Sequence, residues 1–136
     1  MTAKTLFSGT THSAGGPNGY ARSADGFVDL KLPEPHPAAE QLFAAAWSAC
    51  YIGALGVAAG QRKIALPATP EVDATIDLLM EGSEFFLRAR FEVSVPGIDR
   101  ELAQELIDTA HAICPYSKAV HGNIEVETKL VELALA

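Results

Sequence analysis

Apolar and polar residues alternate in two neighbouring segments of the chain, Val72 to Met80 and Phe85 to Val95. Alternation with a period of two directs successive side chains to opposite faces of a β-strand, so both segments predict half-buried strands. The residues between them, Glu81-Gly-Ser-Glu84, predict the turn of a hairpin. Shorter patterns bounded by turn residues predict further strands. The predicted strands cover residues 4–12, 20–23, 27–32, 72–80, 85–95 and 123–133.

Two other segments have helical patterns. Residues 38–60 are rich in alanine and apolar nearly all round after Gln41, which predicts a long helix buried in the middle of the structure. Residues 100–113 have apolar side chains at helical spacing, with Asp99 as a natural N-cap and Cys114-Pro115 as the end. This order of elements predicts an α+β fold, in which a mainly antiparallel sheet packs with two principal helices. A chain of 136 residues is close to the commonest domain size, so we expect a single domain over residues 1–136.

Composition and charge narrow the classes of function. The formal net charge is −7, with 49% of the residues apolar and 20% charged. Such a chain lacks the basic face of a nucleic-acid binder and is not attracted to an anionic membrane surface, so we expect neither partner. The longest apolar stretch, residues 43–59, is interrupted by Ser48, Gly53 and Gly56, and residues 1–11 contain no signal-peptide core. We therefore expect a soluble protein in the reducing cytoplasm.

The chain has two cysteines, Cys50 within the first predicted helix and Cys114 at the end of the second. In a reducing compartment, a pair of thiols is more often catalytic, redox-active or metal-binding than a permanent disulfide. If the two helices pack together, their geometry allows the two sulfurs to come into contact. The alternative for Cys50 is a small core residue in an alanine-rich helix. A zinc site that includes His111 is a further alternative, but no CxxC or HxxxH pattern accompanies it, and we expect no metal.

Two long segments carry a resemblance to a known family. Residues 39–55, AEQLFAAAWSACYIGAL, resemble the motif NPEQLFAAGYSACFIGAL of organic hydroperoxide resistance proteins, a branch of the OsmC/Ohr family. Residues 114–126, CPYSKAVHGNIEV, are similar to the second motif of that branch, CPYSNATRGNIDV. Weaker matches at residues 23–32 and 95–100 extend the resemblance, in the same order, over nearly the whole chain.

The resemblance implies a thiol-dependent peroxidase for oxidative-stress defence, built as an intertwined homodimer with its sites at the subunit interface. Cys50 would be the peroxidatic residue that becomes a sulfenic acid, and Cys114 the resolving residue that forms a disulfide with it. Glu40 would be the carboxylate that organises an active-site arginine. The family prefers alkyl and fatty-acid hydroperoxides, needs no bound cofactor, and is reduced by dihydrolipoamide or lipoylated proteins.

The predicted source of the arginine departs from the family pattern. The family has arginine directly after a Gly-Gly pair, whereas Gly15-Gly16 is followed here by Pro17. Arg22 is the nearest residue that can supply the missing cation, and we expect it to pair with Glu40. Glu40 precedes Cys50 by ten residues, so on one straight helix the two stand about 15 Å apart. If Glu40 serves the site, we expect it to come from the partner subunit.

The thiolate is the form of cysteine that attacks a peroxide, and burial of Cys50 by itself disfavours that charged form, so a cation or hydrogen-bond donor must compensate. The apolar side chains of Phe43, Trp47, Tyr51 and Tyr116 are candidates to bind an alkyl tail. One alternative function is that of the stress-inducible OsmC branch, with overlapping chemistry. Another is a non-catalytic module that binds a small hydrophobic ligand between the helices, because a shared fold does not guarantee a shared activity.

Overall fold

The computed structural model describes residues 2–35 and 38–132. The chain forms two compact units, Met1–Ala39 and Glu40–Ala136. Each unit contains one three-stranded sheet, and the three helices all belong to the second unit except for the first residue of α1. The predicted α+β class is therefore confirmed.

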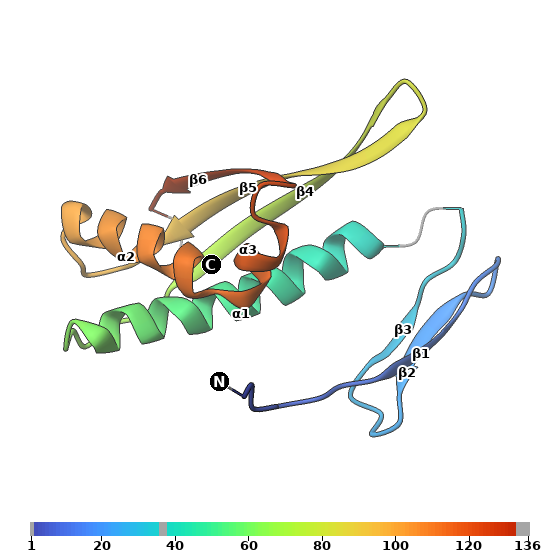
Figure 1. Cartoon of the computed structure of the whole chain (residues 1–136), viewed down its shortest axis with the longest axis horizontal. Helices are drawn as coiled ribbons and strands as arrows, with labels where there is room; N and C mark the ends of the chain where they lie inside the picture. The colour runs from blue at the N-terminus through green and yellow to red at the C-terminus, as the bar shows by residue number, and fades with distance from the viewer. Residues whose placement is uncertain (1, 36–37, 133–136) are drawn as a thin grey trace. The chain divides into compact units, whose positions relative to one another are not determined.

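The N-terminal unit is a small antiparallel sheet in the order β1-β2-β3 (Figure 1). The strands are β1 (Thr11–Ala14), β2 (Tyr20–Ser23) and β3 (Asp29–Lys31). The prediction for β2 is confirmed, and β3 is shorter than expected. The first predicted strand, residues 4–12, is wrong: β1 pairs Thr11 with Ser23 and Ala14 with Tyr20, so the four residues of β2 offer no partner to residues 4–10.

The sheet of the second unit has the order β4-β5-β6. Its strands are β4 (Glu71–Glu81), β5 (Glu84–Ser94) and β6 (Glu125–Leu130). β4 and β5 form the predicted antiparallel hairpin, whereas β5 and β6 run parallel. A parallel pair needs a long crossover connection, and α2 and α3 supply it here. β6 is shorter than the predicted strand 123–133, whose last residue lies outside the described residues.

Both predicted helices are present, together with one that was not predicted. They are α1 (Ala39–Gln61), α2 (Arg100–Ile113) and α3 (Pro115–Val120). Asp99 caps α2 as expected, because its carboxylate accepts a hydrogen bond from the Leu102 N–H at 3.3 Å. Pro115 ends α2, but it also begins α3, since the fixed φ of proline suits the first helical position.

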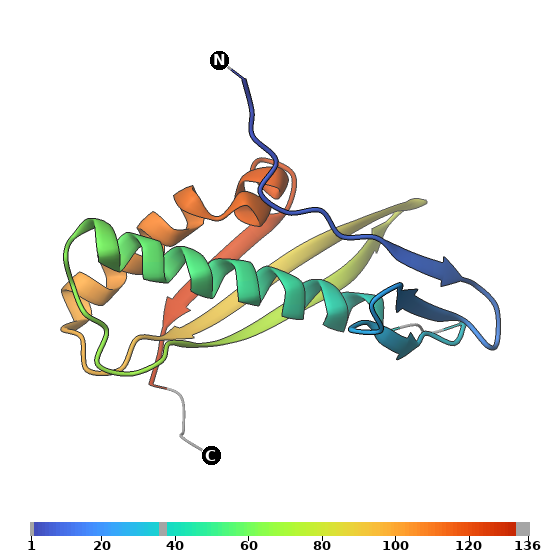
Figure 2. The ribbon, with the colours of Figure 1, turned by 90° about the horizontal axis from the view of Figure 1, so that it is seen from below.

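The core lies between one face of the second sheet and the two long helices (Figures 1 and 2). Phe91 of β5 is at its centre and is packed edge-on against Trp47 and Tyr51 of α1, with ring centroids 4.8 and 5.3 Å away. Burial of α1 is one-sided within a single chain. Its opposite face is exposed and consists of small apolar residues, namely Ala45, Ala46, Ala49, Gly53, Gly56 and Val57.

By length and composition alone, α1 is long and apolar enough to cross a membrane, a test that the core helix of a soluble protein also passes. The fold accounts for much of the apolar character in another way, because the face of α1 toward the sheet contributes Trp47 and Leu55 to the core.

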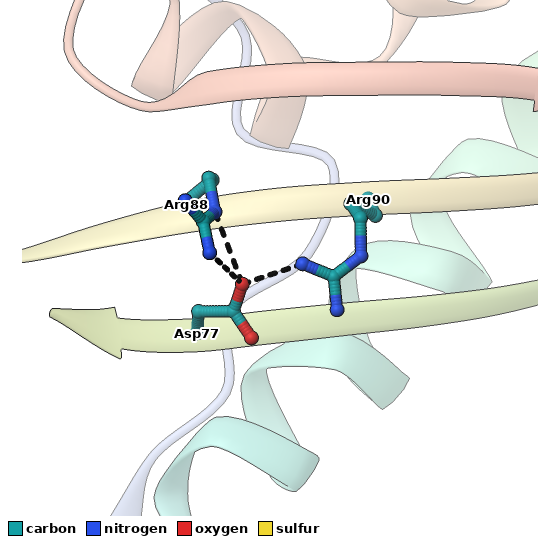
Figure 3. A network of polar contacts seen from close by, with 3 residues as sticks. All are labelled: Asp77, Arg88 and Arg90. Carbon is teal, nitrogen blue, oxygen red and sulfur yellow. Dashed lines mark hydrogen bonds and ion pairs between the residues drawn. The ribbon is translucent and has the colours of Figure 1, made fainter.

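The other face of the second sheet is polar. Asp77 of β4 lies opposite Arg88 of β5 and accepts hydrogen bonds from Arg88 and Arg90 at 2.9 and 2.6 Å (Figure 3). The hydrogen bonds from Arg90 and Arg88 hold the pKa of the Asp77 carboxyl below its ordinary value. Because Ala89, between the two arginines, is fully buried, the strand turns its apolar side chains to the core and its charges to water.

Candidate active site

The structure brings the two cysteines together. The Cys114 thiol donates a hydrogen bond to Cys50 Sγ over a sulfur-to-sulfur distance of 3.1 Å, although the residues are 64 positions apart in the chain. Both thiols are free; Cys114 is fully buried and Cys50 is half-buried. The prediction that the two sulfurs can meet across packed helices is confirmed.

Different elements position the two sulfurs. Cys50 lies inside the continuous helix α1, whereas Cys114 is both the residue that ends α2 and the residue that precedes α3. The Cys114 N–H donates to the Ala110 carbonyl at 2.8 Å, and its carbonyl accepts from the Lys118 N–H at 3.0 Å. Its backbone, with φ −59° and ψ 119°, is not helical, so the chain changes direction at the residue that carries the second sulfur.

The electrostatic surroundings of Cys50 have opposing effects. Burial raises the pKa of the Cys50 thiol above its ordinary value, and the adjoining Cys114 raises it further. The backbone N–H of Tyr116, in the first turn of α3, acts in the opposite direction through a hydrogen bond that favours the thiolate. The described groups around Cys50 therefore leave the neutral thiol favoured, and a reactive thiolate needs further support.

A chain of buried and partly buried hydrogen bonds lies beside the cysteine pair. Trp47 Nε1–H donates to Ser117 Oγ at 2.9 Å, and Ser117 Oγ is also 2.9 Å from His111 Nδ1. On the other side of the ring, His111 Nε2 is 2.8 Å from Thr128 Oγ1. Sequence reasoning missed Ser117 and Thr128 and considered His111 only as a zinc ligand. The one signal in the sequence that pointed to any of these residues was that Ser117 belongs to the second cysteine motif, residues 114–126.

The four aromatic residues expected to bind substrate fall into two groups. Trp47 and Tyr51 are 0% exposed, and the Tyr51 hydroxyl donates to the Ile107 carbonyl at 2.8 Å, so both are core residues in the single chain. Their predicted contact with substrate is not supported by this position. Phe43 is partly buried against the core, and Tyr116, two residues after Cys114, is 48% exposed, so these two retain surface for an apolar ligand.

Glu40 and Arg22 lie on separate elements. α1 is unbroken from Ala39 to Gln61, so Glu40 and Cys50 of one chain are separated by about 15 Å of helix. Arg22 belongs to β2 of the N-terminal unit, where its Nε donates to Asp29 at 3.1 Å and its guanidinium lies 4.3 Å from the centre of the Tyr20 ring. The ion pair is exposed, and such pairs contribute about 1 kcal/mol or less, so Asp29 holds Arg22 only weakly.

The described residues do not provide a metal site. No group of three or more His, Cys, Asp or Glu side chains that could hold an ion occurs within residues 2–35 and 38–132. The zinc alternative built on His111 and the two cysteines therefore receives no support. The arrangement instead offers two-thiol chemistry, since the pair is close enough to form a disulfide after a small movement.

Comparisons with known proteins identify the family and the fold. The family model described as OsmC-like protein matches residues 32–129. The organic hydroperoxide resistance protein of Xanthomonas axonopodis pv. citri is 36% identical over 93% of this chain and 96% of its own. The crystal structure of the organic hydroperoxide resistance protein OhrB of Bacillus subtilis superposes with a TM-score of 0.83 at 36% identity, covering 93% of this chain and 100% of that one. An organic hydroperoxide resistance protein from Elizabethkingia anophelis gives a TM-score of 0.86 at 33% identity, over 96% of this chain and all of the other.

Proposed function

The chain belongs to the OsmC-like family, and we propose that it is a thiol peroxidase that reduces organic hydroperoxides to alcohols in defence against oxidative stress. The observation that carries the proposal is the 3.1 Å contact between the Cys50 and Cys114 sulfurs, which come from distant parts of the chain. The organic hydroperoxide named in the relatives gives the substrate class.

The proposed reaction uses each sulfur once. The Cys50 thiolate attacks the terminal oxygen of the hydroperoxide; an S–O bond forms, the O–O bond breaks, and the alkoxide leaves and takes a proton to become the alcohol. Cys50 is then a sulfenic acid. The Cys114 thiol attacks its sulfur, so that an S–S bond forms and the hydroxyl leaves as water. The two thiols have supplied the two electrons that reduce the peroxide.

Turnover requires an external dithiol. Thiol–disulfide exchange would return both cysteines to the thiol form and oxidise the dithiol to its own disulfide. We propose dihydrolipoamide or a lipoylated protein as this reductant, as the family resemblance implies. No bound cofactor takes part in the proposed cycle, and we expect the protein to work in the reducing cytoplasm.

The thiolate of Cys50 needs a cation, and we propose that Arg22 supplies it with Glu40 as its carboxylate partner. Burial disfavours the charged sulfur, and the Tyr116 N–H is the group in the described chain that counteracts it. Because α1 is continuous, Glu40 would have to reach the site from a second copy of the chain. The exposed small-residue face of α1 supports such a homodimer, since small apolar side chains allow another backbone to come close.

The surroundings of the pair favour an alkyl hydroperoxide over hydrogen peroxide. Phe43 and Tyr116 keep apolar surface accessible, and burying that surface against an alkyl tail contributes about 25 cal/mol for each Å² removed from water. Hydrogen peroxide has no apolar part to bury and gains nothing from these side chains.

Mass spectrometry after one equivalent of an alkyl hydroperoxide tests the proposal. We expect the intact chain to lose two hydrogens as the Cys50–Cys114 disulfide forms, and dihydrolipoamide to sustain turnover of tert-butyl hydroperoxide. A chain that neither changes mass nor consumes peroxide would support the alternative of a non-catalytic module for a hydrophobic ligand. Retained turnover in a Cys50→Ser variant would exclude Cys50 as the attacking residue.

A further inference from the structure

Cys114 is the joint between two helices. One residue separates the end of α2 at Ile113 from the start of α3 at Pro115. The direction of the Cys114 side chain therefore depends on the angle between the two helices. α3 has only six residues, and no side chain caps its N-terminus, so its own helical structure gives little resistance to a change in that angle.

A hydrogen bond spans this joint. His111 lies three residues before Cys114 and Ser117 three residues after it, and His111 Nδ1 is 2.9 Å from Ser117 Oγ. The imidazole is itself held in place, because it packs against the ring of Tyr51 at 4.4 Å and the ring of Phe91 at 5.3 Å. Nε2 contacts Thr128 of β6 at 2.8 Å. The ring thus connects α3 to the core and to the sheet.

The same serine connects the joint to the helix that carries the other cysteine. Ser117 Oγ accepts the hydrogen bond of Trp47 Nε1–H at 2.9 Å, and Trp47 lies three residues, about one helical turn, before Cys50. Trp47 is fully buried and Ser117 is 8% exposed, so both groups would lose a partner that water does not easily replace. These bonds therefore fix the Cys114 joint relative to the Cys50 turn of α1.

The neutral form of His111 suits this role. Burial lowers the pKa of His111, and the charge of Asp108 on the same helix acts against that effect. Ser117 accepts from Trp47 and has one hydrogen left, which it can donate to an unprotonated Nδ1, while Nε2–H donates to Thr128 Oγ1. With these donors and acceptors, the hydroxyl hydrogen of the buried Ser117 is used in a hydrogen bond. The hydroxyl hydrogen of Thr128 is not needed by His111, and Thr128 is partly exposed to solvent.

We propose that His111 is a positioning residue for the resolving step: through Ser117 it holds the α2–α3 joint at the angle that brings Cys114 Sγ to Cys50 Sγ. The inference deepens the proposed peroxidase function and rests on it. His111 has no hydrogen bond to either sulfur among the described contacts, so its effect on the chemistry passes through Ser117 and the backbone of Cys114.

The two chemical steps depend on the joint to different degrees. Attack on the hydroperoxide needs Cys50 and its thiolate, which α1 carries. Formation of the disulfide needs Cys114 to reach the sulfenic sulfur, so a looser joint slows this step far more than attack, which the joint affects through the Tyr116 N–H that hydrogen-bonds Cys50. A sulfenic acid that waits longer is exposed to a second peroxide molecule and becomes a sulfinic acid, which thiols do not reduce.

Quenched-flow mass spectrometry on the full chain separates the two steps. Single-turnover reactions with tert-butyl hydroperoxide are stopped with a sulfenate trap, and the sulfenic, disulfide and sulfinic forms are counted over time. In His111→Phe, which keeps an aromatic ring but loses the hydrogen bonds to Ser117 and Thr128, we expect attack within about twofold of wild type. Disulfide formation should be about tenfold slower, because the lost bond to Ser117 is the one that holds the joint. Sulfinic acid should accumulate at high peroxide concentration.

Matched variants identify the bond that matters. Ser117→Ala removes the other partner of the His111–Ser117 hydrogen bond and should also slow disulfide formation far more than attack. The test therefore stays informative even if His111→Phe does not fold. His111→Asn, whose side-chain oxygen can accept from Ser117, should restore much of the resolving rate. His121→Asn changes an exposed histidine beyond α3 and should leave both steps at wild-type rates.

The outcomes distinguish this inference from the function on which it rests. Wild-type protein that forms no disulfide with the hydroperoxide would contradict the proposed function itself. Wild-type disulfide formation with an unchanged resolving rate in both His111→Phe and Ser117→Ala would overturn the positioning role alone. Equal slowing of attack and resolution in these variants would also overturn it, since that pattern indicates a general loss of structure.

Discussion

Cys50 and Cys114 lie on supports of different kinds. Cys50 is carried by a helix of 23 residues, whose position is set by packing of Trp47, Tyr51 and Leu55 against the sheet. Cys114 lies where two helices meet, and side-chain hydrogen bonds bracket it. The proposed attacking sulfur thus has a continuous scaffold, whereas the proposed resolving sulfur depends on a joint. The difference indicates that the two steps of the proposed reaction can be tuned separately.

Removing each sulfur should give the largest effects and tests the difference between Cys50 and Cys114 most directly. Cys50→Ser should lose all consumption of alkyl hydroperoxide, because a serine hydroxyl is not ionised at neutral pH. Cys114→Ser should consume one equivalent at the wild-type rate and leave Cys50 as sulfenic acid, with a second equivalent consumed only as that acid is oxidised further to sulfinic acid. Rapid-mixing peroxide assays with mass spectrometry check both, and continued turnover by Cys114→Ser would remove it from the cycle.

Phe91→Ala should affect both supports at once. The ring is 1% exposed and contacts Trp47 and Tyr51 of α1 as well as His111 of α2, so its loss leaves a cavity shared by the two helices. Destabilisation by about 3–5 kcal/mol is expected, measured by urea unfolding. Phe85→Ala is a matched control, because that side chain is 70% exposed in the same strand and should cost far less. Similar losses in the two variants would contradict the packing described for the core.

Arg22→Ala should change the attacking step and leave the resolving step intact. If Arg22 supplies the cation, its loss allows burial to keep the pKa of Cys50 high, so the pH profile of peroxide attack moves upward. The thiolate fraction below the pKa rises tenfold per pH unit, so a shift of about one unit slows attack about tenfold at neutral pH and has no effect above the pKa. Stopped-flow rates over a range of pH measure this.

Arg62→Ala is the control for that substitution. Arg62 also forms an exposed ion pair, with Glu105, and it has no proposed part in the site. Its profile should overlay that of wild type. A profile for Arg22→Ala that also overlays would exclude Arg22 as the replacement for the arginine that the family places after its Gly-Gly pair.

Asp77→Asn should give the smallest effect. Asp77 binds two arginines on the outer face of the sheet, away from both cysteines' helices, and the arginines are 44% and 43% exposed (Figure 3). Exposed ion pairs of this kind contribute little to stability, and the effect should shrink further in high salt. Both chemical steps should be unchanged. A clear loss of peroxidase activity would show that this face of the sheet takes part in function.

Regular periodicity made most of the second unit predictable from sequence. The alternation in 72–80 and 85–95, the apolar helix 38–60 and the capped helix 100–113 all occur close to the predicted bounds. The errors lie where the local sequence pattern does not determine the structure. The first strand follows the extent of its partner β2, α3 is too short for a periodic signal, and the parallel direction of β6 depends on a crossover that only tertiary structure reveals.

The site was predictable to a different extent. The family motifs single out Cys50 and Cys114, and the helix spacing correctly indicates that Glu40 cannot reach Cys50 within one continuous helix. Trp47 and Tyr51 are of the residue types that line substrate pockets, but they lie in the core. This could not be predicted, because a sequence does not say which side of an all-round apolar helix packs against the sheet. The bonds among Trp47, Ser117, His111 and Thr128 connect four elements, and no spacing rule brings such distant positions together.

Trp47 provides a built-in optical reporter of the proposed redox cycle. It is the one tryptophan of the chain, and its indole is bonded to the helix that follows Cys114 and lies one turn from Cys50. Any oxidation that alters these surroundings should change the ultraviolet emission of the protein, so each stage of the cycle can be followed in real time without a dye. Unlabelled protein could then be screened against candidate peroxides and reductants in a plate fluorimeter.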